Sequence, residues 1–167
     1  VRKLVYTSIY GIEGRCAFDA IIRSNRTTED DVRQSGLEWV IGRNGLYIDA
    51  DIEALGDYRK AGVVTNSAGD GRCAYTSRAE LGFAYARLLT SENCQQETLN
   101  LCGEPVTQAQ LVDGMNQAFG TQLVYEPMGV ESYLRDRQAA HGEFFGGVIA
   151  GIYEGIRAGA FDVPSDY

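Results

Sequence analysis

Short apolar runs alternate with helical patterns along the chain, and this alternation predicts an α/β protein. Leu4-Val5-Tyr6 is a β-prone run that ends at Thr7-Ser8, and residues 37–41 form a second buried strand candidate. Further strands are predicted at residues 63–65, 73–75, 97–101 and 123–125. Because strands and helices follow one another in turn, we expect part of the sheet to be parallel.

Two helices are predicted by the residues that begin them. Ser77-x-x-Glu80 and Thr107-x-x-Gln110 are capping boxes, in which each side chain satisfies a free backbone N–H of the first turn. Apolar residues recur at helical spacing behind both boxes. Weaker patterns predict an irregular segment at 9–26, a polar helix at 28–35, a turn at 43–45 and a helix at 46–58.

The segment Gly69-Asp70-Gly71 predicts a tight turn between the strands at 63–65 and 73–75. It resembles the start of a dinucleotide-binding loop, but the third glycine is missing. It also leads into a strand, whereas the dinucleotide fingerprint opens a helix. We therefore interpret it as the turn of a hairpin.

Four glycines recur every fourth residue near the C-terminus, at Gly147, Gly151, Gly155 and Gly159. On a helix they would form a stripe without side chains, although each glycine costs about 0.5–1 kcal/mol relative to alanine. Charged neighbours exclude a membrane dimer motif. Two interpretations remain: tight packing within the protein or an oligomer, and space for a planar ligand.

The charge balance excludes one class of partner. Acidic residues outnumber basic residues by 23 to 15, which gives a formal net charge of −8. Nucleic-acid binding needs clustered Lys and Arg, so we expect no nucleic-acid partner. No run of about 18 apolar residues occurs, and a membrane-spanning helix is therefore not predicted.

The four cysteines, Cys16, Cys73, Cys94 and Cys102, are expected to be reduced, partly buried thiols of a cytoplasmic protein. No CxxC pair occurs, and the single histidine, His141, cannot complete a Cys/His cluster. The sequence therefore predicts no metal site. A Cys94–Cys102 disulfide is compatible with the spacing, but nothing in the sequence requires it.

Most catalytic templates do not fit the sequence. His141 lies in a polar helix tail and is interpreted as solvated, which leaves no base for a Ser-His-Asp triad. Neither a Gly-x-Ser-x-Gly elbow nor a P-loop occurs. The paired carboxylates Asp30-Asp31 and Asp49/Asp51 are interpreted as parts of a solvated surface.

Polar and aromatic residues at the ends of two predicted strands suggest a binding pocket. Thr7 and Ser8 follow the first strand, and Asn44 and Tyr47 follow the second. Ligands of open α/β sheets bind beyond the carboxyl ends of the strands. An Asn side chain can hydrogen-bond an amide, and a Tyr ring can stack on a planar ligand.

An ordered set of motifs resembles the NmrA-like atypical short-chain dehydrogenases. It comprises Val5-Tyr6-Thr7-Ser8 and the segments 35–47 (SGLEWVIGRNGLY), 62–71 (GVVTNSAGDG), 76–81 (TSRAEL), 98–101 and 106–107. The resemblance covers residues 1 to about 130 and continues more loosely beyond them. It is strongest to the branches of type 2 NAD(P)H:quinone oxidoreductases and triphenylmethane reductases.

The resemblance implies the C-terminal part of a Rossmann-type NAD(P)-binding fold with a small substrate lobe, the N-terminal glycine-rich half being absent. Residues 1–60 would be the remnant of the dinucleotide-binding sheet. Residues 61–167 would be mainly substrate lobe, with strand 97–101 returning to the sheet. The implied contacts to NADP or NAD are Thr7, Ser8, Asn44, Gly45, Leu46 and Tyr47, and those to substrate are Tyr47, Gly147 and Gly151.

The implied activity is hydride transfer from NAD(P)H to a quinone or similar flat acceptor, in a full-length parent of which this chain would be an inactive fragment. Many short-chain dehydrogenases use a Tyr-x-x-x-Lys proton relay. The two lysines here, Lys3 and Lys60, do not complete one, which favours the quinone-reductase branch.

Two other interpretations remain open. The parent protein could be a non-catalytic NmrA-like dinucleotide sensor that binds a protein partner, because a missing Tyr-Lys pair suits a sensor equally well. Alternatively, the chain could be an independent domain. It would then have to cover the sheet edge at residues 4–7, most simply as a homo-oligomer.

Overall fold

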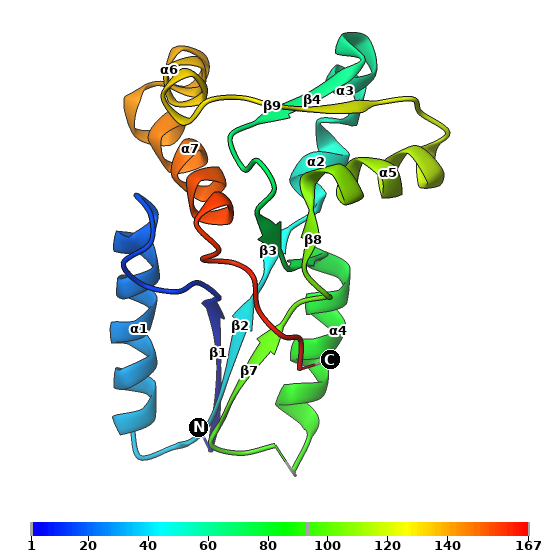
Figure 1. The fold of residues 1–167 in the computed structure, drawn as a ribbon. Coiled ribbons are helices and arrows are strands. Elements are labelled where there is room, and N and C mark those ends of the chain that lie inside the picture. The colour runs from blue at the N-terminus through cyan, green and yellow to red at the C-terminus, as the bar shows by residue number, and fades with distance from the viewer. Residues whose placement is uncertain (1, 93, 167) are drawn as a thin grey trace.

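The computed structural model describes residues 2–92 and 94–166 of the chain. Its lower half is a parallel sheet with helices on both faces (Figure 1). The strand order is β1-β2-β7, with β1 at Lys3–Ile9, β2 at Glu38–Asn44 and β7 at Glu97–Leu101. The strand predicted at 97–101 therefore lies in the same sheet as the first two predicted strands.

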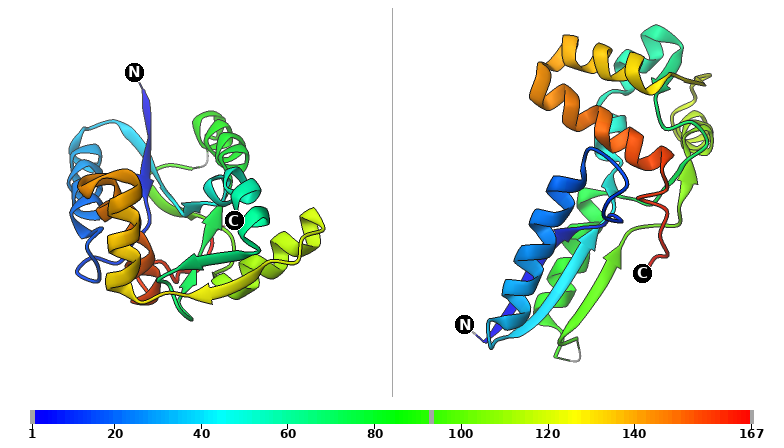
Figure 2. Two further views of the ribbon diagram at one scale, coloured as in Figure 1. Left: turned by 90° about the horizontal axis from the view of Figure 1, so that it is seen from above. Right: turned by 60° about the vertical axis from the view of Figure 1, so that its left-hand side comes forward.

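Helix α1 (Asp19–Gln34) packs on β1 and β2 from one side, and α4 (Arg78–Thr90) packs on them from the other (Figure 2). This explains the continuous apolar run in β2, because a strand covered on both faces buries every side chain. Val40 and Ile41, which point to opposite faces, are both fully buried.

Three short pairs of strands lie in the upper half, together with most of the remaining helices (Figure 1). Helices α2 (Asp49–Glu53), α3 (Leu55–Ala61) and α5 (Gln108–Phe119) belong to it. The strand pairs are β3 (Leu46–Tyr47) with β6 (Tyr75–Thr76), β4 (Val63–Asn66) with β9 (Val124–Pro127), and β5 (Arg72–Cys73) with β8 (Val106–Thr107). The core of this half is formed by Leu55, Val64, Leu111, Val112, Met115 and Leu123.

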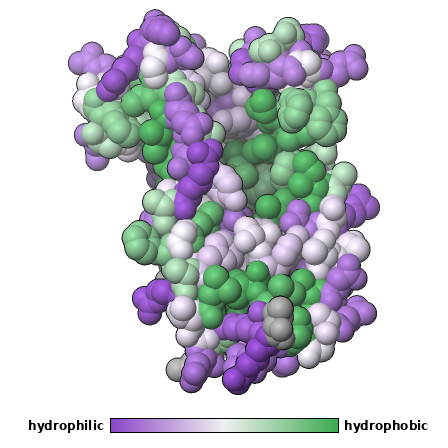
Figure 3. All heavy atoms as spheres, turned by 180° about the vertical axis from the view of Figure 1, so that it is seen from behind, coloured by the Kyte–Doolittle hydropathy of each residue, from purple (hydrophilic) through white to green (hydrophobic). Residues whose placement is uncertain are grey.

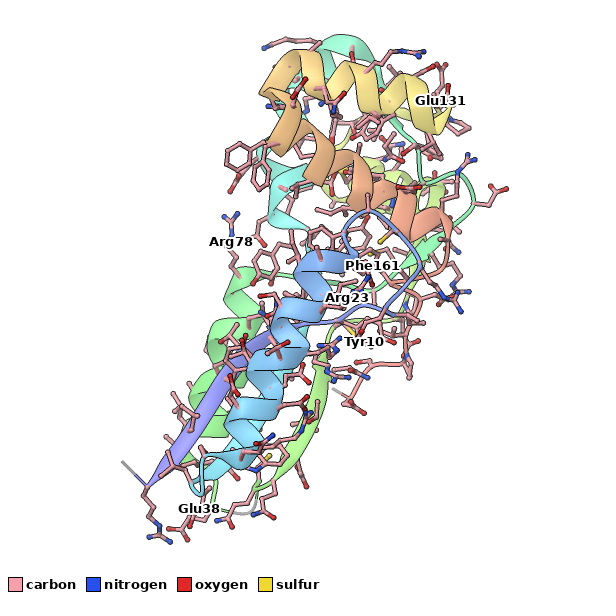
Figure 4. All side chains as sticks on the ribbon, turned by 90° about the vertical axis from the view of Figure 1, so that its left-hand side faces the viewer. Tyr10, Arg23, Glu38, Arg78, Glu131 and Phe161 are labelled. Atoms are coloured by element: carbon pink, nitrogen blue, oxygen red, sulfur yellow. The ribbon has the colours of Figure 1, made fainter. Side chains whose placement is uncertain are left out.

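Two C-terminal helices form a hairpin above the sheet, α6 (Val130–His141) and α7 (Glu143–Arg157). The loop before α1 rises to the C-terminal end of α7, where the Ile12 N–H donates to the Ala160 carbonyl (Figure 4). The chain after α7 then returns toward β7. The helical hairpin is thereby tied to the sheet at two places.

Several local predictions are confirmed. Both capping boxes are present, and they start α4 and α5 at Ser77 and Thr107 as predicted. All four cysteines are free, so the Cys94–Cys102 bridge does not form. His141 is exposed at the end of α6. In the part of the chain that the structure describes, no helix is both long and apolar enough to cross a bilayer.

The predicted irregular segment at 9–26 is wrong in its second half, because α1 begins at Asp19 rather than at residue 28. The reason is the chemistry of its buried face. Ile22 and Val32 are buried on it, but so is Glu29, which interrupts the apolar period. Because one of its buried positions is a carboxylate, α1 lacks the apolar period that identifies a helix in the sequence.

Three predictions around the two tight turns are also wrong. Strand β2 continues to Asn44, inside the turn predicted at 43–45, and the helix predicted at 46–58 starts too early, because residues 46–47 form a strand, and is divided into α2 and α3. The Gly69–Gly71 turn does not close a hairpin, since β4 pairs in parallel with β9. Strand β4 thus takes a partner about sixty residues later in the chain, which no local signal reveals.

The glycine stripe is divided in the structure. A Cβ on Gly151 would lie 3.2 Å from Ala17 Cβ, and one on Gly155 would lie 2.7 Å from the Phe161 ring. A Cβ on Gly147 would meet nothing within 4 Å, and Gly159 follows the end of α7. Close packing inside the protein therefore explains Gly151 and Gly155, but it does not explain Gly147.

Candidate functional site

A cavity of about 470 Å³ lies beyond the carboxyl ends of β1 and β2, between the sheet, α2 and α7. Seen from behind, hydrophobic side chains gather in a hollow in the upper part of the molecule (Figure 3). Most of the cavity wall is apolar or aromatic. The lining residues are Ile9, Tyr10, Phe18, Asn44, Gly45, Leu46, Tyr47, Ala50, Asp51, Tyr75, Ile149, Ile152, Tyr153 and Ile156.

The link from β2 to β3 forms one wall of this cavity, and its path depends on Gly45. A Cβ at this position would lie 2.5 Å from the Ala74 carbonyl oxygen and 2.7 Å from Cys102 Cβ. Only glycine allows the two backbones to approach so closely. Leu46 can then donate its N–H to the Ala74 carbonyl, so that β3 pairs with β6. Gly45 thus places Asn44 and Tyr47 at the carboxyl end of β2, beside the cavity.

Asn44 is the centre of a short hydrogen-bonded chain. The Tyr85 hydroxyl donates to Asn44 Oδ1 at 2.6 Å, and Asn44 Nδ2 donates to the Tyr47 hydroxyl oxygen at 3.0 Å. These bonds fix the orientation of the Asn44 amide. Because the Tyr47 oxygen accepts, its own O–H can donate to a ligand. Tyr47 is 40% exposed, so a ligand could reach it.

Asp51 is the one carboxylate among the described residues that line the cavity. It is only 5% exposed, and the Tyr58 hydroxyl donates to its Oδ1 at 3.0 Å. Loss of solvent raises the pKa of Asp51 above its ordinary value, and the Tyr58 hydrogen bond lowers it less. The sequence-based assignment of Asp51 to a solvated surface is therefore wrong, because α2 turns this residue toward the interior.

Tyrosine side chains surround the same space. Burial raises the pKa of Tyr75 and of Tyr153 well above the ordinary value, so both remain neutral. Figure 4 shows Tyr10 just past the end of β1, below α7, and burial raises its pKa as well. The cavity can therefore hold a planar, largely apolar molecule, with the polar groups of Asn44, Tyr47 and Asp51 at its wall.

The structure brings together four of the residues predicted to bind the cofactor. Asn44, Gly45, Leu46 and Tyr47 all line the cavity. Thr7 is an exposed residue of β1, and neither it nor Ser8 is a lining residue. The predicted substrate residues Gly147 and Gly151 are not lining residues either, whereas Tyr47 is. These assignments to cofactor and substrate stay predictions.

Ser8 belongs to a buried ion network instead. Its hydroxyl donates to Glu29 Oε1 at 2.7 Å, and neither side chain is exposed. Glu29 also accepts from Arg26, Arg33 and Arg43, with N–O distances of 2.6–3.0 Å. Although burial opposes ionisation, these donors lower the pKa of Glu29 to about 2. The network joins α1 to β1 and β2 beside the cavity.

The residues of the cavity wall that sequence reasoning missed include Tyr10, Asp51 and Tyr153. Tyr10 directly follows the first strand, so the rule that ligands bind beyond strand ends could have identified it. Asp51 and Tyr153 lie on α2 and α7, and no local signal shows which way these helices face. Among the described residues, no group of three or more His, Cys, Asp or Glu side chains could hold a metal ion.

Comparisons with known proteins show what the chain resembles. No family model matches it. It is 27% identical over 133 residues to (4-alkanoyl-5-oxo-2,5-dihydrofuran-3-yl)methyl phosphate reductase of Streptomyces griseus, covering 79% of the chain and 47% of the relative. It is 29% identical over 125 residues to the NmrA-like family domain-containing oxidoreductase flvB of Aspergillus flavus, covering 74% and 40%.

A third relative is quinone oxidoreductase 2 of Escherichia coli, 28% identical over 100 residues, with 59% of the chain and 35% of the relative covered. The structure of Citrobacter sp. triphenylmethane reductase complexed with NADP(H) matches with a TM-score of 0.87 at 27% identity, covering 99% of this chain and 59% of that one. The chain spans less than half the length of these curated relatives.

These matches show homology to NmrA-like, atypical short-chain dehydrogenases, including quinone oxidoreductase 2 and triphenylmethane reductase. They also show an α/β architecture that corresponds to about three fifths of a Rossmann-fold reductase. The expected α/β fold and the expected homology to NmrA-like reductases are confirmed at this level. The division into two parts at residue 60 stays a prediction.

Proposed function

We propose that this chain forms the acceptor-binding part of an NAD(P)H-dependent reductase that reduces a quinone or a similar flat molecule. The observation that carries the proposal is the largely apolar cavity at the carboxyl ends of β1 and β2. It is walled by the Asn44–Tyr47 segment that the family resemblance assigned to the nicotinamide side. The homologous quinone oxidoreductase 2 and the NADP(H)-bound triphenylmethane reductase support the same reaction class.

The residues present fit the nicotinamide end of the cofactor. The oriented Asn44 amide can hydrogen-bond a carboxamide, and the Tyr47 ring offers a flat surface beside it. The pyrophosphate does not fit the same cavity, because its described lining residues include the Asp51 carboxylate, no Lys or Arg, and no glycine-rich turn that opens a helix. We propose that the pyrophosphate binds to a part of the protein that corresponds to the remaining length of the relatives.

The chemistry that NAD(P)H supplies when it is bound is hydride donation to the acceptor. This chain would position the acceptor against the nicotinamide and would not itself supply a reactive group. The side chains of Phe18, Ile149 and Ile152 form apolar walls that hold a flat acceptor and exclude water. Tyr47 and Asn44 would fix its distance from the nicotinamide. Holding donor and acceptor in contact is the main source of rate enhancement in such a site.

The proposal predicts that a longer protein is active and that the 167-residue chain alone is not. The protein formed by this chain together with any glycine-rich strand-turn-helix segment encoded in frame ahead of it should oxidise NADPH in the presence of menadione. The 167-residue chain alone should not. A tenfold or greater loss of kcat/KM is expected for Gly45→Val, because the side chain would displace the Asn44–Tyr47 wall (about 1.4 kcal/mol or more). Wild-type kcat/KM in Gly45→Val would contradict the proposal.

A second candidate function is a non-catalytic dinucleotide sensor with a protein partner. It is favoured by the absence of Lys and His among the residues that line the cavity, because no residue there forms the usual proton relay. The same longer protein discriminates the two functions. Saturable NADP(H) binding without oxidation by menadione or any dye would favour the sensor. NADPH oxidation that depends on the quinone would favour the reductase.

The edge of β1 that faces away from β2 is a place where a further strand could join the sheet. β1 pairs with β2 on one side only among the described residues. An unpaired strand edge recruits another strand. We propose that this edge receives the part of the protein that corresponds to the rest of the relatives. If the chain forms a dimer that persists in the longer protein, the edge serves self-association instead.

A further inference from the structure

We propose that the cavity selects flat organic cations over neutral molecules of the same shape, with Asp51 as the counter-charge. The inference rests on the proposed function, since it names the class of acceptor for the same site. Three features of the structure carry it. They are an incompletely paired buried carboxylate, a wall of tyrosine rings and the lack of a basic side chain among the described residues that line the cavity.

The carboxylate of Asp51 is short of partners. Its Oδ1 accepts one hydrogen bond from Tyr58, and its Oδ2 accepts none within residues 2–92 and 94–166, although this atom keeps some contact with solvent. Asp51 forms no ion pair with Lys, Arg or His in this part of the chain. A carboxylate buried in this way is normally compensated by a cation, because the unpaired charge costs several kcal/mol. A cationic ligand would supply that compensation.

Aromatic rings complete the recognition of a cation. Tyr10, Tyr47, Tyr75 and Tyr153 line the cavity together with Asp51. The face of an aromatic ring carries negative charge density and attracts cations, most strongly where water is excluded. A delocalised cation, whose charge is spread over fused rings, has little hydration to lose on entering such a space. An anion would meet the Asp51 carboxylate, and none of the described residues that line the cavity is a lysine or an arginine, although Arg15, Arg26 and Arg43 interact electrostatically with Tyr10.

A pair of probes that differ mainly in charge tests the inference. The 167-residue chain is titrated in the dark with N-methylphenazinium and with phenazine, and the dissociation constants are measured by calorimetry without any dinucleotide. The wild type should bind the cation at least about tenfold more tightly. Asp51→Asn keeps the acceptor for Tyr58 but removes the charge, and it should abolish the preference. Asp113→Asn, an exposed site on α5 with the same change in charge, should retain it.

A pH titration of the wild type tests the same point if Asp51→Asn fails to fold. As the pH falls through the acid range below pH 7, cation binding should weaken when Asp51 takes up a proton, which occurs at a higher pH than for an ordinary aspartate, while phenazine binding stays constant. The other titratable groups that interact with Asp51 have pKa values raised above their ordinary values and remain neutral in this range. They are Tyr58, Cys73, Tyr75, Tyr133 and Tyr153.

The possible binding results distinguish a failure of the charge selection from a failure of the proposed function. Equal binding of the two probes, or a preference that survives in Asp51→Asn, overturns the charge selection but leaves the reductase proposal intact. A neutral probe that binds more tightly indicates that Asp51 is protonated and acts as a donor, which also overturns the inference. If neither probe binds, the cavity is not an acceptor site and the proposed function fails with it.

Discussion

Glu29 and Asp51 are two of the buried carboxylates of this protein, and their surroundings differ completely. Glu29 lies between α1 and the sheet, fully buried, and accepts from three arginines and a serine. Asp51 lies at the cavity and accepts from one tyrosine. Ion pairing and hydrogen bonds lower the pKa of Glu29 to about 2, whereas burial raises the pKa of Asp51.

The comparison separates a structural charge from a charge that is available to a ligand. Glu29 has all its hydrogen-bonding capacity used within the protein, so it can only hold elements together. Asp51 is buried at a cost that the fold does not offset, and such groups concentrate at functional sites. Substitutions at the two carboxylates and at Ser8 test this difference.

Glu29→Gln should lower the free energy of unfolding by about 3–5 kcal/mol, because three arginines would lose their common partner. Urea denaturation followed by circular dichroism measures this change. Asp30→Asn is the matched control, since Asp30 is an exposed neighbour that pairs with Arg33. It should cost less than about 1 kcal/mol. Equal effects of the two substitutions would show that the Glu29 network is not structural.

Acidification should remove the contribution of Glu29. Its folded pKa is lower than its ordinary value, so the stabilisation is present above about pH 4.5 and disappears toward pH 2. The loss is roughly 3 kcal/mol over this window. Comparing unfolding curves of the wild type and Glu29→Gln across pH isolates the effect. A difference between the two proteins that does not change with pH would contradict the low pKa.

Ser8→Ala should destabilise the protein by about 1.5–3 kcal/mol, because a buried hydrogen bond to a charged acceptor is lost. The effect is smaller than that of Glu29→Gln, since the three arginines remain. Thermal and urea unfolding measure it, with Thr7→Ala on the exposed side of the same strand as control. If Ser8 instead contacts the cofactor, Ser8→Ala would weaken NADP(H) binding in the longer protein and leave stability unchanged.

Asp51→Asn should change stability least and in the opposite direction, with a gain of up to about 1 kcal/mol at pH 7, because a poorly compensated charge is removed. The folded pKa of Asp51 is raised, so its contribution favours folding at low pH and is lost as pH rises through that pKa. The wild type should therefore gain stability relative to Asp51→Asn on acidification. A loss of more than 2 kcal/mol in Asp51→Asn at pH 7 (roughly the effect of breaking a compensated pair) would place Asp51 with Glu29.

Local features of the fold could be predicted from the sequence, whereas the burial of Glu29 and Asp51 could not. Capping boxes such as Ser77-x-x-Glu80 are local and were predictable, as were the apolar strands of the sheet and the cavity wall at Asn44–Tyr47. The burial of Glu29 and Asp51 was not predictable, because it depends on arginines and helices distant in the chain. The pairing of β4 with β9 was missed for the same reason.

The most direct test of the comparison is a carbon-13 NMR titration of the side-chain carboxyls, with Glu29→Gln and Asp51→Asn used to assign the two signals. Glu29 should titrate near pH 2. Asp51 should titrate above the ordinary aspartate value in the free protein, and its pKa should fall when N-methylphenazinium is added. An Asp51 signal that titrates at or below the ordinary value in the free protein would contradict the account.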